Sequence, residues 1–250
     1  MATLYYYVDE CYREHGSYWH CNIGGAILQV ENVVDAEVAL ETQIYSLATT
    51  DGFPYAQGEF KYTDFFRETS DEFKLKIAGA LTTALLRLNV RFLVSHAMVE
   101  KKKLAHFGAA AALGSPSKAI QQLSCVNIAH YLAGPASSSP VQVIVDLGIA
   151  ESFRPIYDMY CSTVRSIPML KARGIPDSDI TIPHYRNLPR PVFLDSGDSR
   201  LLQYSDLLIG LLLARQLQVL TPFKSALLAQ IEPIFKNVEV LSVEWNKGEV

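Results

Sequence analysis

The sequence lacks several features that common functional classes require. Its net charge is −4 and its pI is about 5.9, so it lacks the basic face that salt-driven binding to long duplex DNA usually needs. It contains no Walker A loop and no G-x-G-x-x-G segment, the phosphate-binding loops of many nucleotide-binding domains. None of its cysteines forms a C-x-x-C pair, so no zinc pattern is evident. We therefore interpret all four as free thiols: Cys11, Cys21, Cys125 and Cys161.

Long hydrophobic runs are also missing. The longest apolar stretch, Leu207 to Ala214, is far shorter than the ~20 residues that a membrane-spanning helix needs. The N-terminus runs straight into a strand pattern and has no basic or long apolar leader segment. Hydrophobic residues nevertheless make up 49% of the 250 residues, enough for a sizeable core. We therefore expect one cytoplasmic, soluble domain spanning 1–250, without membrane contact.

Hydrophobic periodicity predicts strands that alternate with helices, which is typical of a layered α/β domain. Ser70 predicts a helix N-terminus, and the segment from Cys11 to Trp19 is expected to be a loop. A helical insertion is expected around 100–140. The predicted strands are 4–8, 20–30, 90–99, 141–145, 180–182, 191–194 and 238–243, and the predicted helices are 70–88, 34–47, 104–134, 150–172, 200–220 and 223–236.

Three acidic residues stand out by position among the 26 of the chain. Asp9 ends the first aromatic strand, and Asp146 ends the buried strand Val141 to Val145. Asp206 lies within an otherwise apolar helix, where a lone carboxylate is costly unless it is paired, hydrogen-bonded or metal-bound. Asp146 is equally suited to cap the helix that follows it. Carboxylates that converge at a sheet edge repel one another, and divalent cations with oxygen ligands relieve that repulsion.

Five segments, in order along almost the whole chain, resemble the domain-of-unknown-function family 3800. That family has an aromatic strand ending in Asp-Glu-Ser-Gly, an early Gly-Gly, a Glu-x-Lys, a strand-final Asp and a late Leu-Gln-x-Ala-Asp-Leu. The corresponding segments here are Tyr6-Tyr7-Val8-Asp9-Glu10, Gly24-Gly25, Glu59-Phe60-Lys61, Val143-Ile144-Val145-Asp146 and Leu202-Gln203-Tyr204-Ser205-Asp206-Leu207-Leu208. The chain departs from the pattern at Cys11-Tyr12, which replace Ser-Gly, and at Ser205, which replaces Ala.

The resemblance implies an RNase H-like mixed sheet with helices packed on both faces, and a metal-dependent nuclease. It implies that two Mg²⁺ or Mn²⁺ ions act on a phosphodiester bond of a nucleic acid, RNA or DNA being undetermined. The residues implied as catalytic and metal-binding carboxylates are Asp9, Glu59, Asp146 and Asp206, with Glu10 and Lys61 as auxiliary residues.

Other interpretations of the same sequence stay open. A catalytically inactive RNase H-like binding module keeps the fold without the reaction, and a phosphohydrolase would use the metals on a small nucleotide. Asp51 with Glu59-x-Lys61 also imitates the pattern of restriction-endonuclease-like enzymes, but that leaves the other acids unexplained. The apolar C-terminal helices, 207–235, fit a homodimer interface and burial in the core equally well.

Several other residues carry weaker functional interpretations. Ser196 and Ser205 have no evident histidine partner, which disfavours serine hydrolysis. The six histidines show no paired ligand spacing, and His96 and His184 are retained as weak site candidates. The basic residues that could contact phosphate, or be solvated instead, are Lys101, Lys102, Lys103, Arg186, Arg190 and Arg200.

Overall fold

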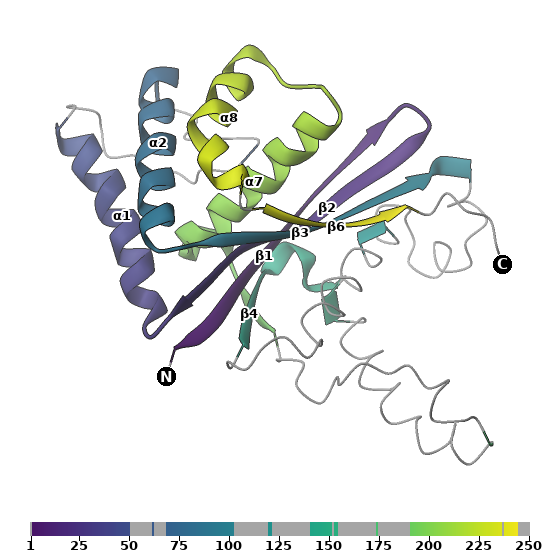
Figure 1. Cartoon of the computed structure of the whole chain (residues 1–250), viewed down its shortest axis with the longest axis horizontal. Helices are drawn as coiled ribbons and strands as arrows, with labels where there is room; N and C mark the ends of the chain where they lie inside the picture. The colour runs from purple at the N-terminus through teal and green to yellow at the C-terminus, as the bar shows by residue number, and fades with distance from the viewer. Residues whose placement is uncertain are drawn as a thin grey trace.

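A mixed six-stranded sheet forms the centre of the molecule (Figure 1), in the order β5-β4-β1-β2-β3-β6. The computed structural model describes residues 2–50, 62, 69–102, 120–121, 141–151, 153–154, 174, 191–236 and 238–244. The α/β class predicted from the sequence is confirmed. The strands are β1 (Thr3–His15), β2 (Tyr18–Val30), β3 (Arg91–Glu100), β4 (Val141–Asp146), β5 (Val192–Leu194) and β6 (Val238–Glu244), and the longer helices are α1 (Val33–Thr50), α2 (Asp71–Arg87), α7 (Arg200–Gln216) and α8 (Pro222–Phe235).

The sheet combines antiparallel and parallel pairing around β1. Strands β1, β2 and β3 form an antiparallel meander, whereas β4 pairs parallel to β1 and β5 pairs parallel to β4. Strand β6 extends the other edge, parallel to β3. Because β1 and β4 run in the same direction, the residues that directly follow their paired segments are neighbours across the two strands.

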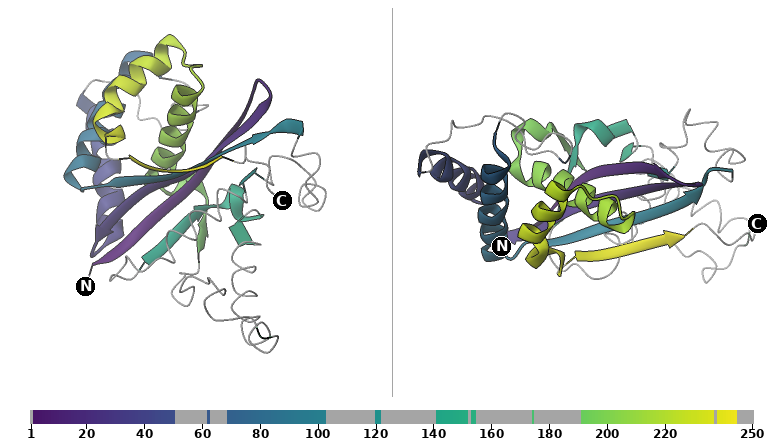
Figure 2. Two further views of the ribbon diagram at one scale, coloured as in Figure 1. Left: turned by 45° about the vertical axis from the view of Figure 1, so that its right-hand side comes forward. Right: turned by 90° about the horizontal axis from the view of Figure 1, so that it is seen from above.

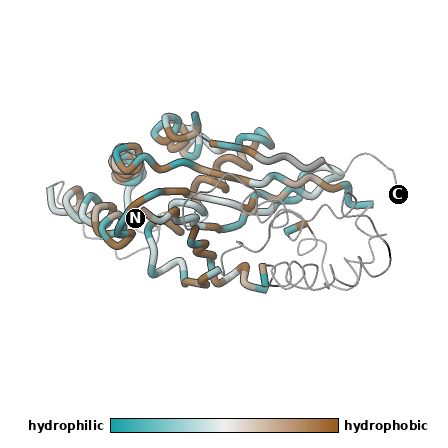
Figure 3. Tube along the Cα trace, turned by 60° about the horizontal axis from the view of Figure 1, so that its bottom comes forward, coloured by the Kyte–Doolittle hydropathy of each residue, from teal (hydrophilic) through white to brown (hydrophobic). Residues whose placement is uncertain are grey.

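The four longer helices pack on one face of the sheet (Figures 1 and 2). Tyr7 and Phe92 belong to the core on that face, together with Tyr204 of α7 and residues of α1, α2 and α8. Tyr6 and Val8 point to the opposite face, since side chains alternate along a strand. The described residues that cover that second face include Ile149 and Phe153. Hydrophobic residues accordingly recur along both strands and helices (Figure 3).

The predicted loop from Cys11 to Trp19 is wrong, because these residues extend a long hairpin. Cys11 pairs with Asn22 and His15 pairs with Tyr18, so only Gly16 and Ser17 form the turn. Gly16 has the positive φ of 58° that a tight turn favours. The hairpin extends past the helices (Figure 1), so its outer residues need no apolar alternation.

Most other element predictions within the described residues are confirmed. Ser70 caps α2, where its side chain accepts a hydrogen bond from the Phe73 backbone N–H at 3.2 Å. Helix α7 ends at Gln216 rather than at Leu220, and Gln218 then adopts a positive φ of 56° that no helix continues through. The predicted strand 180–182 and most of the predicted helices 104–134 and 150–172 lie outside the described residues.

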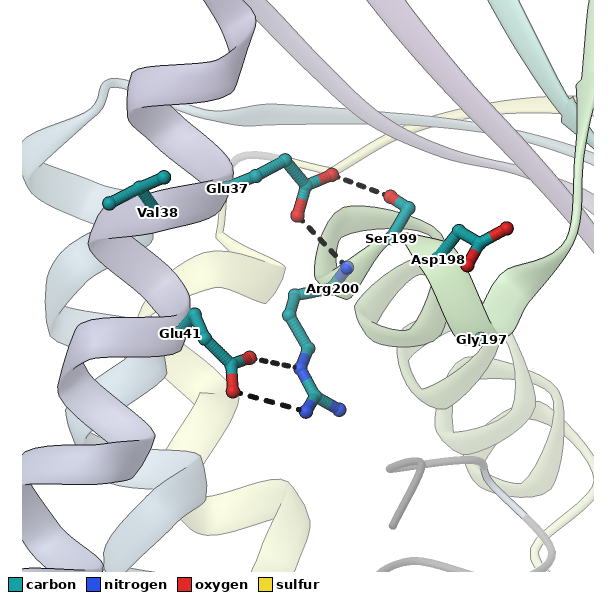
Figure 4. Close-up of a pocket in the computed structure, with 7 residues that line it drawn as sticks. All are labelled: Glu37, Val38, Glu41, Gly197, Asp198, Ser199 and Arg200. Carbon is teal, nitrogen blue, oxygen red and sulfur yellow. Dashed lines mark hydrogen bonds and ion pairs between the residues drawn. The ribbon is translucent and has the colours of Figure 1, made fainter. Parts of the chain in front are cut away.

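The N-terminus of α7 is held by two glutamates of α1 (Figure 4). Glu37 accepts hydrogen bonds from the Ser199 hydroxyl at 2.5 Å and from the Arg200 backbone N–H at 2.9 Å. Glu41 pairs with the Arg200 guanidinium at 2.6 Å. These residues line a pocket of about 270 Å³ between α1 and the start of α7. A carboxylate at a helix N-terminus compensates the unsatisfied N–H groups there, so Glu37 fixes where α7 begins.

We predict that Glu37→Ala lowers the free energy of unfolding by roughly 2–4 kcal/mol, because two charge-assisted hydrogen bonds are lost at a mostly buried helix end. Glu41→Ala should cost about 1 kcal/mol or less, since its carboxylate is 38% exposed. Urea unfolding of both variants measures the difference. Equal costs for the two would contradict the assignment of Glu37 as the anchor of α7.

Candidate functional site

Asp9 and Asp146 lie side by side, just past the paired segment of β1 and β4. Asp146 ends β4 as predicted, but the prediction that Asp9 ends its strand is wrong, because the hairpin with β2 continues β1 to His15. Val8 of β1 is in register with Val145 of β4, and the two aspartates are the next residue on each strand. Each aspartate lies two positions after a residue whose side chain faces α7, Tyr7 on β1 and Ile144 on β4. Alternation therefore directs both carboxylates to the face that α7 covers.

Helix α7 approaches the sheet closely at a break in the β1–β2 ladder. Tyr6 pairs with Ile27 and Asp9 pairs with Gly24, but no pairing joins the residues between them. The Ala26 backbone N–H instead donates to the Ser205 hydroxyl of α7 at 3.0 Å, and that hydroxyl donates to the Leu201 carbonyl at 2.8 Å. Ser205 thus attaches α7 to β2 beside Asp9.

Gly25 makes this approach sterically possible. A Cβ at this position would lie 2.5 Å from the Ser205 hydroxyl oxygen and 2.3 Å from the Tyr7 carbonyl oxygen. Its φ of 156° also disfavours an L-residue side chain. The glycine pair in the sequence therefore marks the contact between sheet and helix.

Asp206 follows Ser205 and carries the third carboxylate to the same region. Its Oδ2 accepts a hydrogen bond from the Tyr62 backbone N–H at 2.8 Å. The Tyr62 ring packs on Gly210, where a Cβ would lie 2.2 Å from the ring. Asp206 and Gly210 are four residues apart on α7, so the helix presents both to Tyr62 on one face.

The charges of Asp206 and Asp146 act on the carboxyl of Asp9. Asp9 is 8% exposed, and burial followed by the charges of Asp206 and Asp146 raises the pKa of its carboxyl well above the usual range. Burial and the same two charges raise the pKa of Glu10 to about 7. Such concentration of negative charge is costly, and perturbed acids of this kind cluster at functional sites.

Backbone amides orient each of the three carboxylates. The Glu10 N–H donates to Asp9 Oδ1 at 2.7 Å, and the Gly148 N–H donates to Asp146 Oδ2 at 2.9 Å. Asp146 thereby caps the short helix Leu147–Ile149. Its alternative interpretation as a cap is therefore confirmed, and capping through one oxygen is compatible with a place in the acidic site. We call Asp9, Asp146 and Asp206 the acidic site.

Mg²⁺ and Mn²⁺ prefer hard oxygen ligands, and the acidic site supplies carboxylate oxygens from three separate elements. A buried aspartate whose pKa is raised by two other carboxylates is the charge pattern that a divalent cation relieves. Among the described residues, however, no three His, Cys, Asp or Glu side chains are gathered closely enough to hold one ion. The donor chemistry therefore fits the ions, and the ligand set remains a prediction.

The other predicted site residues have different outcomes. Glu59 and Lys61 lie outside the described residues. Tyr62, which follows Lys61, donates a backbone hydrogen bond to Asp206. The Glu10 side chain accepts a hydrogen bond from Gln121 Nε2 at 2.9 Å, while its backbone N–H contacts Asp9. Ser205, which the sequence marked as a departure from a family pattern and as a serine without a histidine partner, anchors α7 to β2.

Sequence reasoning missed Tyr62 and Lys224. The Lys224 ammonium lies 3.5 Å from the centroid of the Tyr62 ring, so α8 also contributes to the surroundings of the acidic site. The only sequence signal for Tyr62 is Gly210, a glycine inside an apolar helix that leaves room for a ring. Nothing in the pattern around Lys224 indicates its position, because α8 reaches the site only in the folded chain.

The weaker candidates are partly resolved. Arg200 pairs with Glu41, and Lys101 pairs with Glu14, so both basic residues have structural partners. His96 Nδ1 lies 2.7 Å from Asn22 Oδ1, and burial lowers the pKa of this imidazole to about 4. Cys11 and Cys21 belong to no disulfide, as expected. The candidates outside the described residues are Lys103, Arg186, Arg190, His184, Cys125 and Cys161.

We predict that Gly25→Ala lowers the free energy of unfolding by about 3 kcal/mol or more, because its methyl group would overlap both Ser205 and the Tyr7 carbonyl. Gly16→Ala is the matched control. Gly16 also has a positive φ but has open space around it, so the cost should be only about 1–2 kcal/mol. Denaturant unfolding compares the two, and a Gly25→Ala cost no larger than that of Gly16→Ala would contradict the close approach.

We predict that Asp9→Asn raises the melting temperature by a few degrees in EDTA, since it removes a buried charge that faces two others. The folded-state pKa of Asp9 is raised, so its ionisation destabilises the fold above that pKa. Wild-type stability in EDTA should therefore increase as pH falls from 8 to 5, and the variant should show less of this increase. A less stable Asp9→Asn protein with an unchanged pH profile would contradict the repulsion.

Searches against protein-family models, curated proteins and solved structures found no match to this chain. The resemblance to family 3800 therefore stays a hypothesis that rests on the quoted motifs. Within the described part of the chain, no helix has the length and apolar character that a membrane span requires.

Proposed function

We propose that this chain is a metal-dependent nuclease that hydrolyses phosphodiester bonds of RNA or DNA with two Mg²⁺ or Mn²⁺ ions. The observation that carries the proposal is the convergence of Asp9, Asp146 and Asp206 from two strands and a helix, with the pKa of Asp9 raised by burial and then by the other two charges. Acids whose pKa is perturbed by burial and by neighbouring carboxylates cluster at functional sites, which supports a metal-binding role for this group.

The sheet arrangement also supports the proposal. An antiparallel β1–β2–β3 meander joined through β1 to parallel β4 and β5 is a mixed sheet of the kind that an RNase H-like fold implies. Two of the acids lie at neighbouring strands of that sheet, and the third comes from the helix packed on them. Fold alone does not determine function, so the acidic site carries the greater weight.

Asp9, Asp146 and Asp206 would hold the ions, and Glu59 completes the proposed ligand set. When bound, two divalent ions supply a hydroxide nucleophile at neutral pH and stabilise the leaving oxygen. The chain's own contribution is orientation. The amides of Glu10, Gly148 and Tyr62 fix one oxygen of each aspartate, which lowers the reorganisation that a reaction would require.

The test is cleavage of 5′-fluorescein-labelled single- and double-stranded RNA and DNA in Mn²⁺, Mg²⁺ or EDTA. Asp9→Asn and Asp206→Asn should each lower kcat/KM by at least about 100-fold, since even losing a residue that supports a metal ligand costs 10–100-fold. Asp35→Asn, an exposed acid in the first turn of α1, is the control and should retain activity. Thermal melting confirms that each variant folds.

The outcomes separate the proposal from its two rivals. Cleavage that survives EDTA or both aspartate substitutions would overturn the two-metal mechanism. Turnover of nucleoside phosphates without cleavage of oligonucleotides would favour a phosphohydrolase that acts on small nucleotides. Oligonucleotide binding with no cleavage, and no change of melting temperature in Mn²⁺, would favour the inactive binding module.

A further inference from the structure

A polar strip leads from the acidic site toward the tip of the β1–β2 hairpin. Cys11 and Arg13 follow Asp9 at alternate positions of β1, so they share its face of the sheet. On β2 the residues in register with them are Asn22 and His20. The hairpin extends beyond the helices (Figures 1 and 2), so this face is uncovered by α7 toward its tip.

Two cations lie beside the acidic site without belonging to it. Arg13 is exposed on the strip. Lys224 comes from the first turn of α8, and its ammonium lies 3.5 Å from the centroid of the Tyr62 ring. The Tyr62 backbone is hydrogen-bonded to Asp206, which links the position of Lys224 to that of the third carboxylate.

Cys11 lies between the acids and the cations. Burial, then Asp206 and Asp9, raise the pKa of its thiol to about 12, whereas the charges of Lys224 and Arg13 act in the opposite direction. Along β1, Cys11 lies between Asp9 and Arg13 on the same face of the sheet.

Neither Arg13 nor Lys224 forms an ion pair with a carboxylate among the described residues. By contrast, Lys76 pairs with Glu72 at 3.4 Å and Arg215 pairs with Glu232 at 3.2 Å. Stacking on Tyr62 fixes the Lys224 ammonium without neutralising it, because a ring attracts a cation but carries no net charge. Both cations thus keep the capacity to bind an anion.

We propose that Lys224 and Arg13 bind the backbone phosphates next to the scissile phosphate of a nucleic-acid strand that runs along the hairpin. This inference rests on the proposed nuclease function and names the part of the substrate that the strip recognises. Metal ions at the acidic site would neutralise the scissile phosphate only. The flanking phosphates need other cations, especially on a chain whose net charge is −4. Phosphate contacts position a strand without reading its sequence, so the strip predicts length dependence rather than base preference.

The first test measures binding of a 5′-fluorescein single-stranded 12-mer, DNA and RNA in separate arms, by fluorescence anisotropy in EDTA across a salt series. Lys224→Gln and Arg13→Gln should each raise Kd about tenfold and reduce the slope of log K against log salt by about 1. Lys224→Arg keeps the charge and should retain most of the slope. The controls are Lys76→Gln and Arg215→Gln, which remove exposed, paired cations and should leave the slope unaltered.

The second test measures cleavage kinetics in Mn²⁺. The loss in Lys224→Gln and Arg13→Gln should fall on KM rather than on kcat. The preference for the 12-mer over bis(4-nitrophenyl) phosphate, which has no flanking phosphates, should fall about tenfold.

The two proposals fail in different ways. If the wild type cleaves, and Lys224→Gln and Arg13→Gln leave KM and the salt slope unchanged, the proposed phosphate-binding role of Lys224 and Arg13 is overturned. The nuclease assignment then stays intact. Salt-sensitive binding that depends on Lys224 and Arg13, without cleavage by the wild type, would support phosphate binding by these two residues and overturn the nuclease assignment. A wild-type protein that neither binds nor cleaves the 12-mer would overturn both.

Discussion

The close approach of α7 to β2 is the constraint on which the rest of the site depends. A side chain on residue 25 would overlap the Ser205 hydroxyl and the Tyr7 carbonyl. Because Gly25 has none, helix and sheet come nearer than ordinary side chains permit. Ser205 then satisfies the Ala26 N–H that the β1–β2 ladder leaves without a strand partner at this point. Asp206 is the next residue, and its carboxylate is carried to Asp9 by the same contact. A local backbone adjustment thus creates a site between two elements that are far apart in sequence.

The acidic site opposes folding, and the surrounding structure offsets that cost. Burial and the charges of Asp206 and Asp146 raise the pKa of Asp9, so ionisation of Asp9 destabilises the folded protein at neutral pH. The fold holds the acidic site through backbone amides and through the apolar residues of α7, which are buried on both sides of Asp206. Glu37 adds a further restraint, since it fixes the N-terminus of the helix that carries the third acid. This arrangement is typical of a site in which binding capacity is maintained at the expense of stability.

The long hairpin gives the site a direction. Residues beyond Asp9 on β1 leave the helical layer, so one face of the sheet changes from an apolar core to a polar surface within a few residues. Asp9 lies at that change, with Cys11 and then Arg13 further along β1, and Lys224 of α8 lies nearby on the Tyr62 ring. A linear polyanion can lie along such a surface, whereas a small substrate would contact only the acids. The geometry therefore relates the chemistry of the site to the length of the substrate.

The sequence by itself determined the α/β class, most element positions and the candidate acids, because apolar periodicity and caps are local signals. Ser70 capping α2 and the strand Val141 to Asp146 are examples. Asp146 ends its strand as expected, whereas Asp9 lies within β1. The sequence could not indicate that Cys11 to His15 form a strand, since an uncovered hairpin needs no apolar alternation. Only the tertiary structure decided that Tyr62 lies against Gly210 and bonds to Asp206, and that Lys224 stacks on the Tyr62 ring. The charge of each side chain and the spacing of apolar residues can be read from the sequence, but the distance between residues far apart in sequence is set by the folded structure.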